Sequence, residues 1–226
     1  KLSVEPVNDA PILSGIEAKL GTGEEDQSFT ITSTDLLKGF TDADDDQLSV
    51  TNIEITNGNG SIDINQEGHW IFTPEANWNG SVDLRSDVIA DNGASTKATQ
   101  SFSLAPVNDS PELTGSKASL DKGIEDTSYI IKSSDLLIGF SDVDNDLLSV
   151  INLETSNGEL ISNDDGTWTL TPSQHFNGDV SLTYLVSDSN GGTIDANQIL
   201  SIASVNDSPV VSGRVNLGSI DEDNEL

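Results

Sequence analysis

The chain repeats itself with a period close to 100 residues. Pro-Val-Asn-Asp-Ala-Pro at residues 6–11 returns as Pro-Val-Asn-Asp-Ser-Pro at 106–111 and as Ser-Val-Asn-Asp-Ser-Pro at 204–209. A period of this length is too long for a solenoid unit, and it matches the size of one independent domain. The sequence therefore predicts tandem domains, with Val-Asn-Asp-x-Pro as the joint between them.

The chain has room for two whole repeats and the edges of two more. We expect the end of a preceding repeat at 1–8, complete repeats at 9–107 and 108–205, and the start of a third repeat at 206–226. We therefore expect the chain to be part of a longer array, in which neighbouring repeats of the same chain are its first partners.

Within each repeat, short strand-like segments are separated by turn residues. Apolar and polar residues alternate, as they do in half-buried strands, at 28–32, 48–55, 128–132 and 148–153. Asn-Gly pairs at 57–58 and 157–158 mark tight turns. The helical candidates, 33–37 and 133–137, are too short for more than about one turn. Roughly seven strands per repeat predict an all-β chain of tandem antiparallel β-sandwich domains, of the immunoglobulin or cadherin-like type.

The charge of the chain limits its partners. There are 39 acidic and 9 basic residues, a formal net charge of −30. Such a surface repels nucleic acid and anionic membranes and attracts cations, although solubility or salt adaptation would also explain the composition alone. The chain has no Cys, so it forms no disulfide. It has no run of 18 apolar residues, so we expect no membrane insertion of this segment.

The acidic residues fall in segments that a sandwich topology brings to the joints. Strand reversal places the Asp-x-Asp-x-Asp loop of a repeat beside the joint that precedes it, and the Glu-Asp pair beside the joint that follows it. At the central joint we expect Glu25, Asp26, Asn108, Asp109, Asp142, Asp144, Asp146 and Asp188. The corresponding residues of the upstream joint are Asn8, Asp9, Asp42, Asp44, Asp46 and Asp91, and those of the downstream joint are Glu125, Asp126, Asn206 and Asp207.

These sets of residues favour a calcium site. So many carboxylates in one place repel one another unless cations neutralise them. Hard oxygen ligands in this number suit Ca²⁺, which takes six to eight, better than Mg²⁺, which keeps its waters. Each loop alone could be an ordinary solvated turn, and it is the joint recurrence that favours calcium. An EF-hand is excluded, because with Asp42 as position one of the loop, positions six and twelve are Gln47 and Ile53 instead of Gly and Glu.

These motifs resemble the cadherin-like tandem repeats of giant bacterial surface adhesins of the RTX type. Besides the joint, the shared motifs are Phe-x-Asp-x-Asp-x-Asp-x-Leu-Ser-Val at 40–50 and 140–150, Gly-x-Trp-x-x-Thr-Pro at 68–74 and 166–172, Asn-Gly-x-Val at 79–82 and 177–180, and Asp-x-Asn-Gly at 188–191. The first repeat departs from this pattern, since Asp91 is displaced by one residue and Ser86-Asp87 stands where the second repeat has Tyr184-Leu185. The Gly-rich nonapeptides of RTX β-rolls are absent.

The resemblance implies a calcium-stiffened extender on a bacterial cell surface, exported by type I secretion. The alternative is a sandwich module that binds a glycan, a protein or ice, for which Trp78 and Phe176 are the candidate aromatic residues. We expect no enzyme, because His69 and His175 have no counterparts in the other repeat and no nucleophile motif or phosphate-binding loop is present. Trp70 and Trp168 are expected in the cores.

Overall fold

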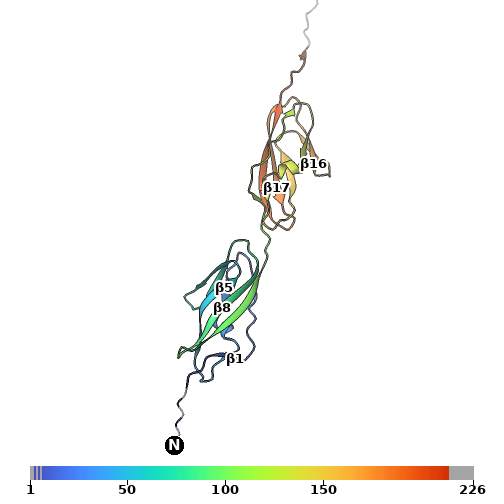
Figure 1. Ribbon diagram of the computed structural model, residues 1–226. Helices are drawn as coiled ribbons and strands as arrows, with labels where there is room; N and C mark the ends of the chain where they lie inside the picture. Colours follow the sequence, from blue (N-terminus) through green and yellow to red (C-terminus); the bar gives the residue numbers. More distant parts are fainter. Residues whose placement is uncertain (1–2, 4, 6, 214–226) are drawn as a thin grey trace, which may run out of the picture. The chain divides into compact units, whose positions relative to one another are not determined.

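The computed structural model describes residues 3, 5 and 7–213, which divide into two compact units. The first unit contains the residues up to 110 together with two loops of the second repeat, 142–146 and 190–192. The second unit contains 111–141, 147–189 and the chain from 193 onward. Figure 1 shows that the regular secondary structure of both repeats is almost entirely β-strand. Residues 214–226, which make up most of the expected start of a third repeat at 206–226, lie outside the described part.

The first repeat is a sandwich of a four-stranded and a three-stranded sheet, with an additional two-residue pair. The strand orders are β2-β9-β8-β5, β3-β7-β6 and β1-β4. The elements are β1 (Ile12–Leu13), β2 (Thr22–Glu24), β3 (Phe29–Ile31), α1 (Ser33–Leu37), β4 (Phe40–Thr41), β5 (Leu48–Asn57), β6 (Gly60–Ile64), β7 (Trp70–Pro74), β8 (Gly80–Ala90) and β9 (Ser95–Ala105).

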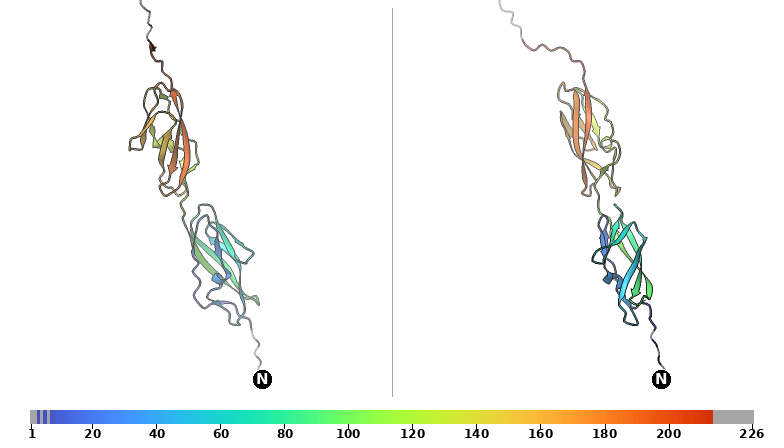
Figure 2. Two further views of the ribbon diagram at one scale, coloured as in Figure 1. Left: turned by 180° about the vertical axis from the view of Figure 1, so that it is seen from behind. Right: turned by 90° about the vertical axis from the view of Figure 1, so that its left-hand side faces the viewer.

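The second repeat has the same topology. Its sheets are β11-β18-β17-β14, β12-β16-β15 and β10-β13, and Figure 2 shows both repeats from two further sides. The elements are β10 (Glu112–Leu113), β11 (Gly123–Ile124), β12 (Tyr129–Lys132), α2 (Ser133–Leu136), β13 (Phe140–Ser141), β14 (Ser149–Thr155), β15 (Glu159–Ser162), β16 (Thr167–Thr171), β17 (Gly178–Ser187) and β18 (Thr193–Ala203).

The all-β sandwich predicted from the sequence is confirmed, and two of its pairings are parallel. Strand β2 runs parallel to β9, and β11 runs parallel to β18. The first strand of each large sheet thus heads in the same direction as the last. The ladder continues past β2, because the Glu25 N–H donates to the Ala105 carbonyl over 3.0 Å. This parallel pairing places Glu25 beside the segment that leaves the first repeat.

The cores lie between the sheets and follow the period-two pattern of the strands. Along β9, the side chains of Ala98, Gln100, Phe102 and Leu104 are buried while those between them are more exposed. Phe102 meets the edge of the Phe72 ring, with centroids 5.4 Å apart. In the second repeat the buried Tyr184 hydroxyl donates to the Leu136 carbonyl over 2.9 Å.

The large aromatic residues of the loops and strands serve these cores. Trp70 and Trp78 pack against the core of the first repeat, and Trp168 and Phe176 pack against that of the second. Trp78 and Phe176 are therefore loop anchors rather than exposed binding aromatics. This removes the residues on which the ligand-binding alternative was based.

The Asn-Gly turns carry the chain from one sheet to the other. Strand β5 belongs to the four-stranded sheet and β6 to the three-stranded sheet, although only two residues separate them. Such a turn brings the chain close to the next strand. At Gly60, with φ of 156°, an added Cβ would lie 2.4 Å from the Thr73 carbonyl oxygen, so only glycine fits.

The helical turns α1 and α2 start differently in the two repeats. Thr32 and Asp35 form a reciprocal capping box at the start of α1, whereas Lys132 provides no side-chain cap for α2. Each helix nevertheless buries a leucine, Leu36 or Leu136. Burial of this leucine, which both repeats share, therefore accounts for the helical turn better than the cap does.

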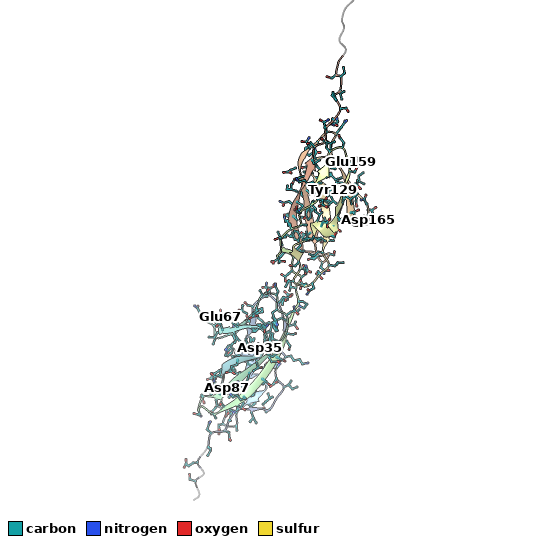
Figure 3. The ribbon with its side chains drawn as sticks, turned by 45° about the horizontal axis from the view of Figure 1, so that its top comes forward. Asp35, Glu67, Asp87, Tyr129, Glu159 and Asp165 are labelled. Atoms are coloured by element: carbon teal, nitrogen blue, oxygen red, sulfur yellow. The ribbon has the colours of Figure 1, made fainter. Side chains whose placement is uncertain are left out.

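Asp87, which is labelled in Figure 3, is an acidic residue of β8 that is only 8% exposed. Its Oδ2 accepts a 2.9 Å hydrogen bond from the Asn52 amide, and Lys97 on β9 lies 2.5 Å from its Oδ1. Asn52 itself has a left-handed backbone, at the register shift of β5. The hydrogen bonds from Asn52 and then Lys97 lower the pKa of Asp87 below its ordinary value.

Because the folded-state pKa of Asp87 is lowered, its contribution to stability is present above its unfolded pKa of about 3.9 and is lost as the pH falls through the lower folded value. We expect Asp87→Asn to destabilise the first repeat near neutral pH and to differ less from wild type in acid. Urea unfolding at pH values from about 2 to 7 measures this difference. Asp83→Asn removes the same charge from β8 and is the control. A gap between Asp87→Asn and wild type that stays constant over this range would contradict the assignment.

Truncation of a central core residue should affect one repeat. Phe72 is fully buried, so Phe72→Ala is expected to destabilise the first repeat by about 3–5 kcal/mol. Ile64→Ala is the control, since Ile64 is 64% exposed and its loss should cost at most about 0.5 kcal/mol. Calorimetry measures both effects, and equal melting temperatures of the two variants would refute this core.

Candidate metal centre

The Asp-x-Asp-x-Asp loops fold around the first of their three carboxylates. Asp42 Oδ1 accepts hydrogen bonds from the backbone N–H groups of Asp44, over 2.8 Å, and Asp46, over 3.4 Å. The turn closes at Asp45, whose left-handed φ of 60° is a conformation that Asp and Asn tolerate. The loop therefore has a fixed shape, which is set by its own backbone.

The loop of the second repeat has the same construction. Asp142 Oδ1 accepts from the backbone N–H groups of Asp144, over 2.9 Å, and Asp146, over 3.3 Å. Asn145 takes the left-handed position with φ of 62°. Asp142, Asp144 and Asp146 each offer one carboxylate oxygen within 4.8 Å of the others.

Each loop is tied to the Asn-Asp of the joint motif. The Asp9 N–H donates to Asp44 Oδ2 over 2.9 Å, and the Asp109 N–H donates to Asp144 Oδ2 over 2.8 Å. Residues 109 and 142–146 belong to the same compact unit. The Asp carboxylate of the joint is thereby held beside the loop carboxylates.

The Glu-Asp pair fixes the other side of the joint motif. Glu25 is 1% exposed, and its Oε1 accepts from the Val107 N–H over 2.7 Å while its Oε2 accepts from the Asn79 amide over 3.0 Å. Asp26, in the left-handed conformation, accepts from the Asn77 N–H over 2.9 Å through Oδ1. The pair therefore connects β2, the loop before β8 and the segment after β9.

In both clusters, the negative charges of neighbouring carboxylates make ionisation of one aspartate less favourable. Burial first, and then the negative charges of Asp26 and Asp144, raise the pKa of Asp109. At the upstream cluster, burial and the nearby Asp91 and Asp42 raise the pKa of Asp46, although a hydrogen bond from Asn92 opposes the shift. A cation would remove both penalties.

Three buried carboxylate oxygens provide the test of fit for a cation. Asp42 Oδ2, Asp109 Oδ2 and Asp142 Oδ2 are shielded from solvent and have no hydrogen-bond donor among the described residues. A buried acceptor without a partner costs roughly 1–3 kcal/mol or more when charged, so such atoms are rare unless an ion or water completes them. Their carboxylate chemistry suits a hard divalent cation. The residues present therefore fit Ca²⁺.

Most of the predicted ligand residues lie in two clusters of the first unit. Upstream, the Asn92 amide donates to Asn8 and Asp46, the Asp9 N–H donates to Asp44, and Asp91 adds its charge. The central cluster gathers Glu25, Asp26, Asn108, Asp109, Asp142, Asp144 and Asp146. Asp188 belongs to the second unit and is 2% exposed.

Two asparagines of the clusters were not predicted. Asn92 donates to Asp46 Oδ2 over 2.8 Å and to Asn8 Oδ1 over 3.2 Å, and Asn190 donates to Asp146 Oδ2 over 2.6 Å. The signal for both was the Asn-Gly that ends the late Asp-rich motif in each repeat. The aspartates of this motif indicate a metal site by their charge, whereas its amides meet the carboxylates only in the folded loops.

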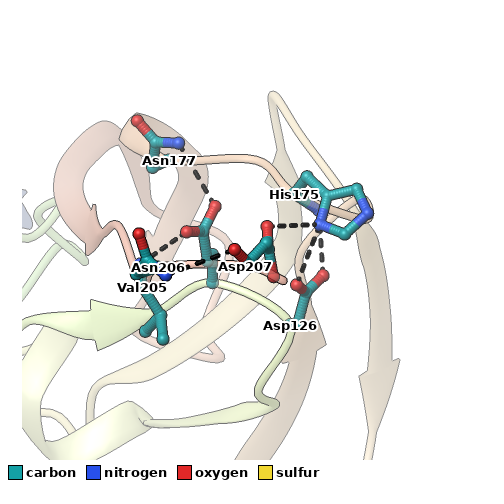
Figure 4. A network of polar contacts seen from close by, with 7 residues as sticks. Asp126, His175, Asn177, Val205, Asn206 and Asp207 are labelled. Atoms are coloured by element: carbon teal, nitrogen blue, oxygen red, sulfur yellow. Dashed lines mark hydrogen bonds and ion pairs between the residues drawn. The ribbon is translucent and has the colours of Figure 1, made fainter. Parts of the chain in front are cut away.

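The downstream end of the second repeat preserves the Glu-Asp arrangement (Figure 4). Glu125 accepts from the Val205 N–H and, over 3.2 Å, from the Asn177 amide. Asp126 Oδ1 accepts from the His175 N–H over 2.8 Å. The His175 ring then faces Asp126 and Asp207, which the sequence did not indicate.

A scan of protein families matches the Cadherin-like domain to residues 7–105 and 107–203. The chain therefore belongs to the cadherin-like domain family. Cadherin-like domains are typically extracellular, calcium-rigidified and non-enzymatic. Among the described residues, no helix is long and apolar enough to cross a membrane.

Solved structures of cadherins are similar in fold. The chain is 15% identical to Drosophila N-cadherin EC1-4, with a TM-score of 0.52 over 88% of this chain and 50% of that chain. Protocadherin Gamma B2 domains 1-5 give 15% identity and a TM-score of 0.47, over 89% of this chain and 40% of that one. The N-cadherin likeness supports the cadherin-like sandwich.

An endo-fucoidan hydrolase of glycoside hydrolase family 107 also aligns, with 16% identity over 90% of this chain and a TM-score of 0.36. The chain spans 30% of the length of that hydrolase, and the score is too low to bear on function. A comparison with curated protein sequences finds no match.

The buried glutamate should stabilise the repeat without any metal. Glu25→Ala leaves the Val107 N–H and the Asn79 amide without their acceptor, so we expect a loss of about 1–3 kcal/mol. The measurement is urea unfolding in EGTA, which separates this effect from ion binding. Glu24→Ala, at the exposed neighbouring position, should be nearly neutral. Equal stability of the two variants would contradict the bridging role.

Proposed function

We propose that the chain is a calcium-stiffened extender segment of a bacterial cell-surface adhesin. The observation that carries this proposal is the central cluster. There the Asp109 N–H donates a hydrogen bond to the Asp144 carboxylate, while one carboxylate oxygen each of Asp109 and Asp142 is buried without a hydrogen-bond donor among the described residues. Carboxylates that repel one another, with two of their oxygens shielded from solvent and lacking a donor, are unfavourable without a cation.

The calcium would be held by residues from four stretches of sequence. The proposed ligands at the central joint are Glu25, Asp26, Asn108, Asp109, Asp142, Asp144, Asp146 and Asp188. Calcium would supply positive charge and connect oxygens that otherwise repel. The upstream and downstream joints are proposed to use their equivalent residues.

The chain's own residues already restrict the joint at two points. The Val107 N–H is fixed by Glu25 and the Asp109 N–H by Asp144, so the backbone is held on both sides of Asn108. Pro106 and Pro111 limit φ on either side of these residues. The ion would add the attraction that keeps the loop of residues 142–146 against the joint.

The setting follows from the acidic composition and the resemblance to RTX-type adhesin repeats. Extracellular calcium modules typically bind with dissociation constants of about 10⁻⁴ to 10⁻³ M. Such sites fill outside a cell and stay empty in a cytosol, which suits a chain exported unfolded by a type I route. A glycan- or protein-binding role is the weaker alternative, because Trp78 and Phe176 pack against the cores.

Calcium removal tests the proposal. Calcium at about a hundredfold excess over its dissociation constant stabilises a folded protein by about 2.7 kcal/mol for each site. We therefore expect a higher melting temperature in calcium than in EGTA. We also expect small-angle scattering to report a narrower range of molecular lengths in calcium.

A matched pair of variants assigns the effect to the central cluster. Asp144→Asn keeps an oxygen for the Asp109 N–H but removes a ligand charge, so the calcium response should shrink. Asp164→Asn makes the same charge change at an exposed turn residue with left-handed φ and should leave the response intact. The proposal would be contradicted if neither the melting temperature nor the range of molecular lengths changed when calcium is added.

A further inference from the structure

We propose that Asp126, His175 and Asp207 form a binding site for a divalent transition metal of the zinc class. This site lies at the end of the second repeat and is distinct in chemistry from the all-oxygen clusters described above. Asp126 and Asp207 also belong to the calcium set proposed for the downstream joint, so calcium and zinc would compete for them, and only zinc gains from the nitrogen ligand His175. The zinc site itself does not rest on the proposed extender function.

The three ligand atoms already have suitable spacing (Figure 4). His175 Nδ1 lies 3.2 Å from Asp126 Oδ2 and 3.1 Å from Asp207 Oδ2, and one ligand atom of each residue lies within 4.8 Å of the others. Zinc bonds to nitrogen and carboxylate oxygen are about 2.0–2.2 Å long, so ligand atoms on one ion lie roughly 3.0–3.6 Å apart. An ion could therefore enter with little movement of the ligands.

The imidazole determines which metals the site prefers. Ca²⁺ and Mg²⁺ take oxygen ligands, whereas imidazole suits Zn²⁺, Cu²⁺, Ni²⁺ and Fe²⁺. The side chains of His175, Asp126 and Asp207 are 56%, 38% and 54% exposed, so water can complete the coordination and the ion can exchange with solvent. Zinc accepts both imidazole nitrogen and carboxylate oxygen as ligands, so all three side chains can bind it.

The scaffold holds the ligands from both sides. Asp126 Oδ1 is occupied by the His175 N–H at 2.8 Å, which leaves Oδ2 to face the ring. The segment that carries Asp207 is anchored where Glu125 accepts the Val205 N–H, and the Asn206 amide donates to the Asp207 carbonyl over 3.2 Å. The ligand positions are thus set by backbone contacts that the metal would not disturb.

The first repeat has the same scaffold without the nitrogen ligand. Asn77 occupies the position of His175, with the same φ of 58°, and its N–H donates to Asp26 Oδ1 over 2.9 Å. An exposed histidine–aspartate ion pair would add at most about 1 kcal/mol to stability, so it gives a weak reason for this substitution. A metal ligand at this position gives a stronger one.

The test is zinc titration of the full 226-residue chain in excess calcium, by calorimetry, with Co²⁺ absorption as a spectroscopic readout. Excess calcium occupies the upstream and central clusters and competes for Asp126 and Asp207, so the zinc binding that survives depends on the nitrogen ligand His175. We expect one zinc equivalent and visible Co²⁺ bands in the wild type. His175→Asn should weaken zinc binding by more than about tenfold, since even second-shell substitutions in metal sites cost 10- to 100-fold.

Two controls make the outcome decisive. His175→Asn introduces the residue that the first repeat already has at the same φ, and its unchanged melting temperature in EGTA would establish that it folds. His69→Asn removes the other histidine of the chain and should leave the zinc affinity unchanged. Equal zinc affinity in the wild type and His175→Asn, or loss of binding in His69→Asn, would overturn the site.

Discussion

The buried glutamate at the end of each repeat is the contact on which the joint depends. Glu25 lies in the ladder beside β9, and its carboxylate accepts one bond from the departing backbone at Val107 and another from Asn79. Glu125 does the same with Val205 and Asn177. Because a buried carboxylate is costly unless its oxygens are hydrogen-bonded, these contacts hold the end of the sheet and the start of the linker in one arrangement. The exposed aspartate that follows each glutamate is thereby directed to the same place in both repeats.

Much of the fold was predictable because its signals are local. Alternation along the strands, the Asn-Gly pairs and the internal period specify short strands in two similar sandwiches. The parallel pairing of β2 with β9 was not predictable in this way, because it depends on which sheet a three-residue strand joins, and its neighbours in space are about 80 residues away in sequence. The route of the Asn-Gly turn between sheets was hidden for the same reason.

The acidic residues of the candidate site could be predicted from the sequence, because carboxylates indicate cation binding by their chemical type. The residues that join them only through the folded geometry could not. The Asp-x-Asp-x-Asp loops and the Asn-Asp of the joint can be recognised in the sequence by their negative charge and by their recurrence in each repeat. The amides of Asn92 and Asn190 and the ring of His175 become visible only once the loops are folded, since each meets carboxylates far away in sequence. Asp87 places a charge in a strand at a position where the second repeat has Leu185. The hydrogen bond from Asn52 and the ion pair with Lys97 explain how the strand accommodates this charge.

The internal hydrogen bonds of the aspartate loops affect the free energy of ion binding. Asp42 and Asp142 each use one oxygen to fix their own turn, and the other oxygen remains buried and unpartnered. An incoming ion would thus meet an ordered half-shell and would not have to fold a loop around itself, which reduces the entropy lost on binding. On the proposed function, an ion could enter or leave such a preformed loop without unfolding the repeat that carries it.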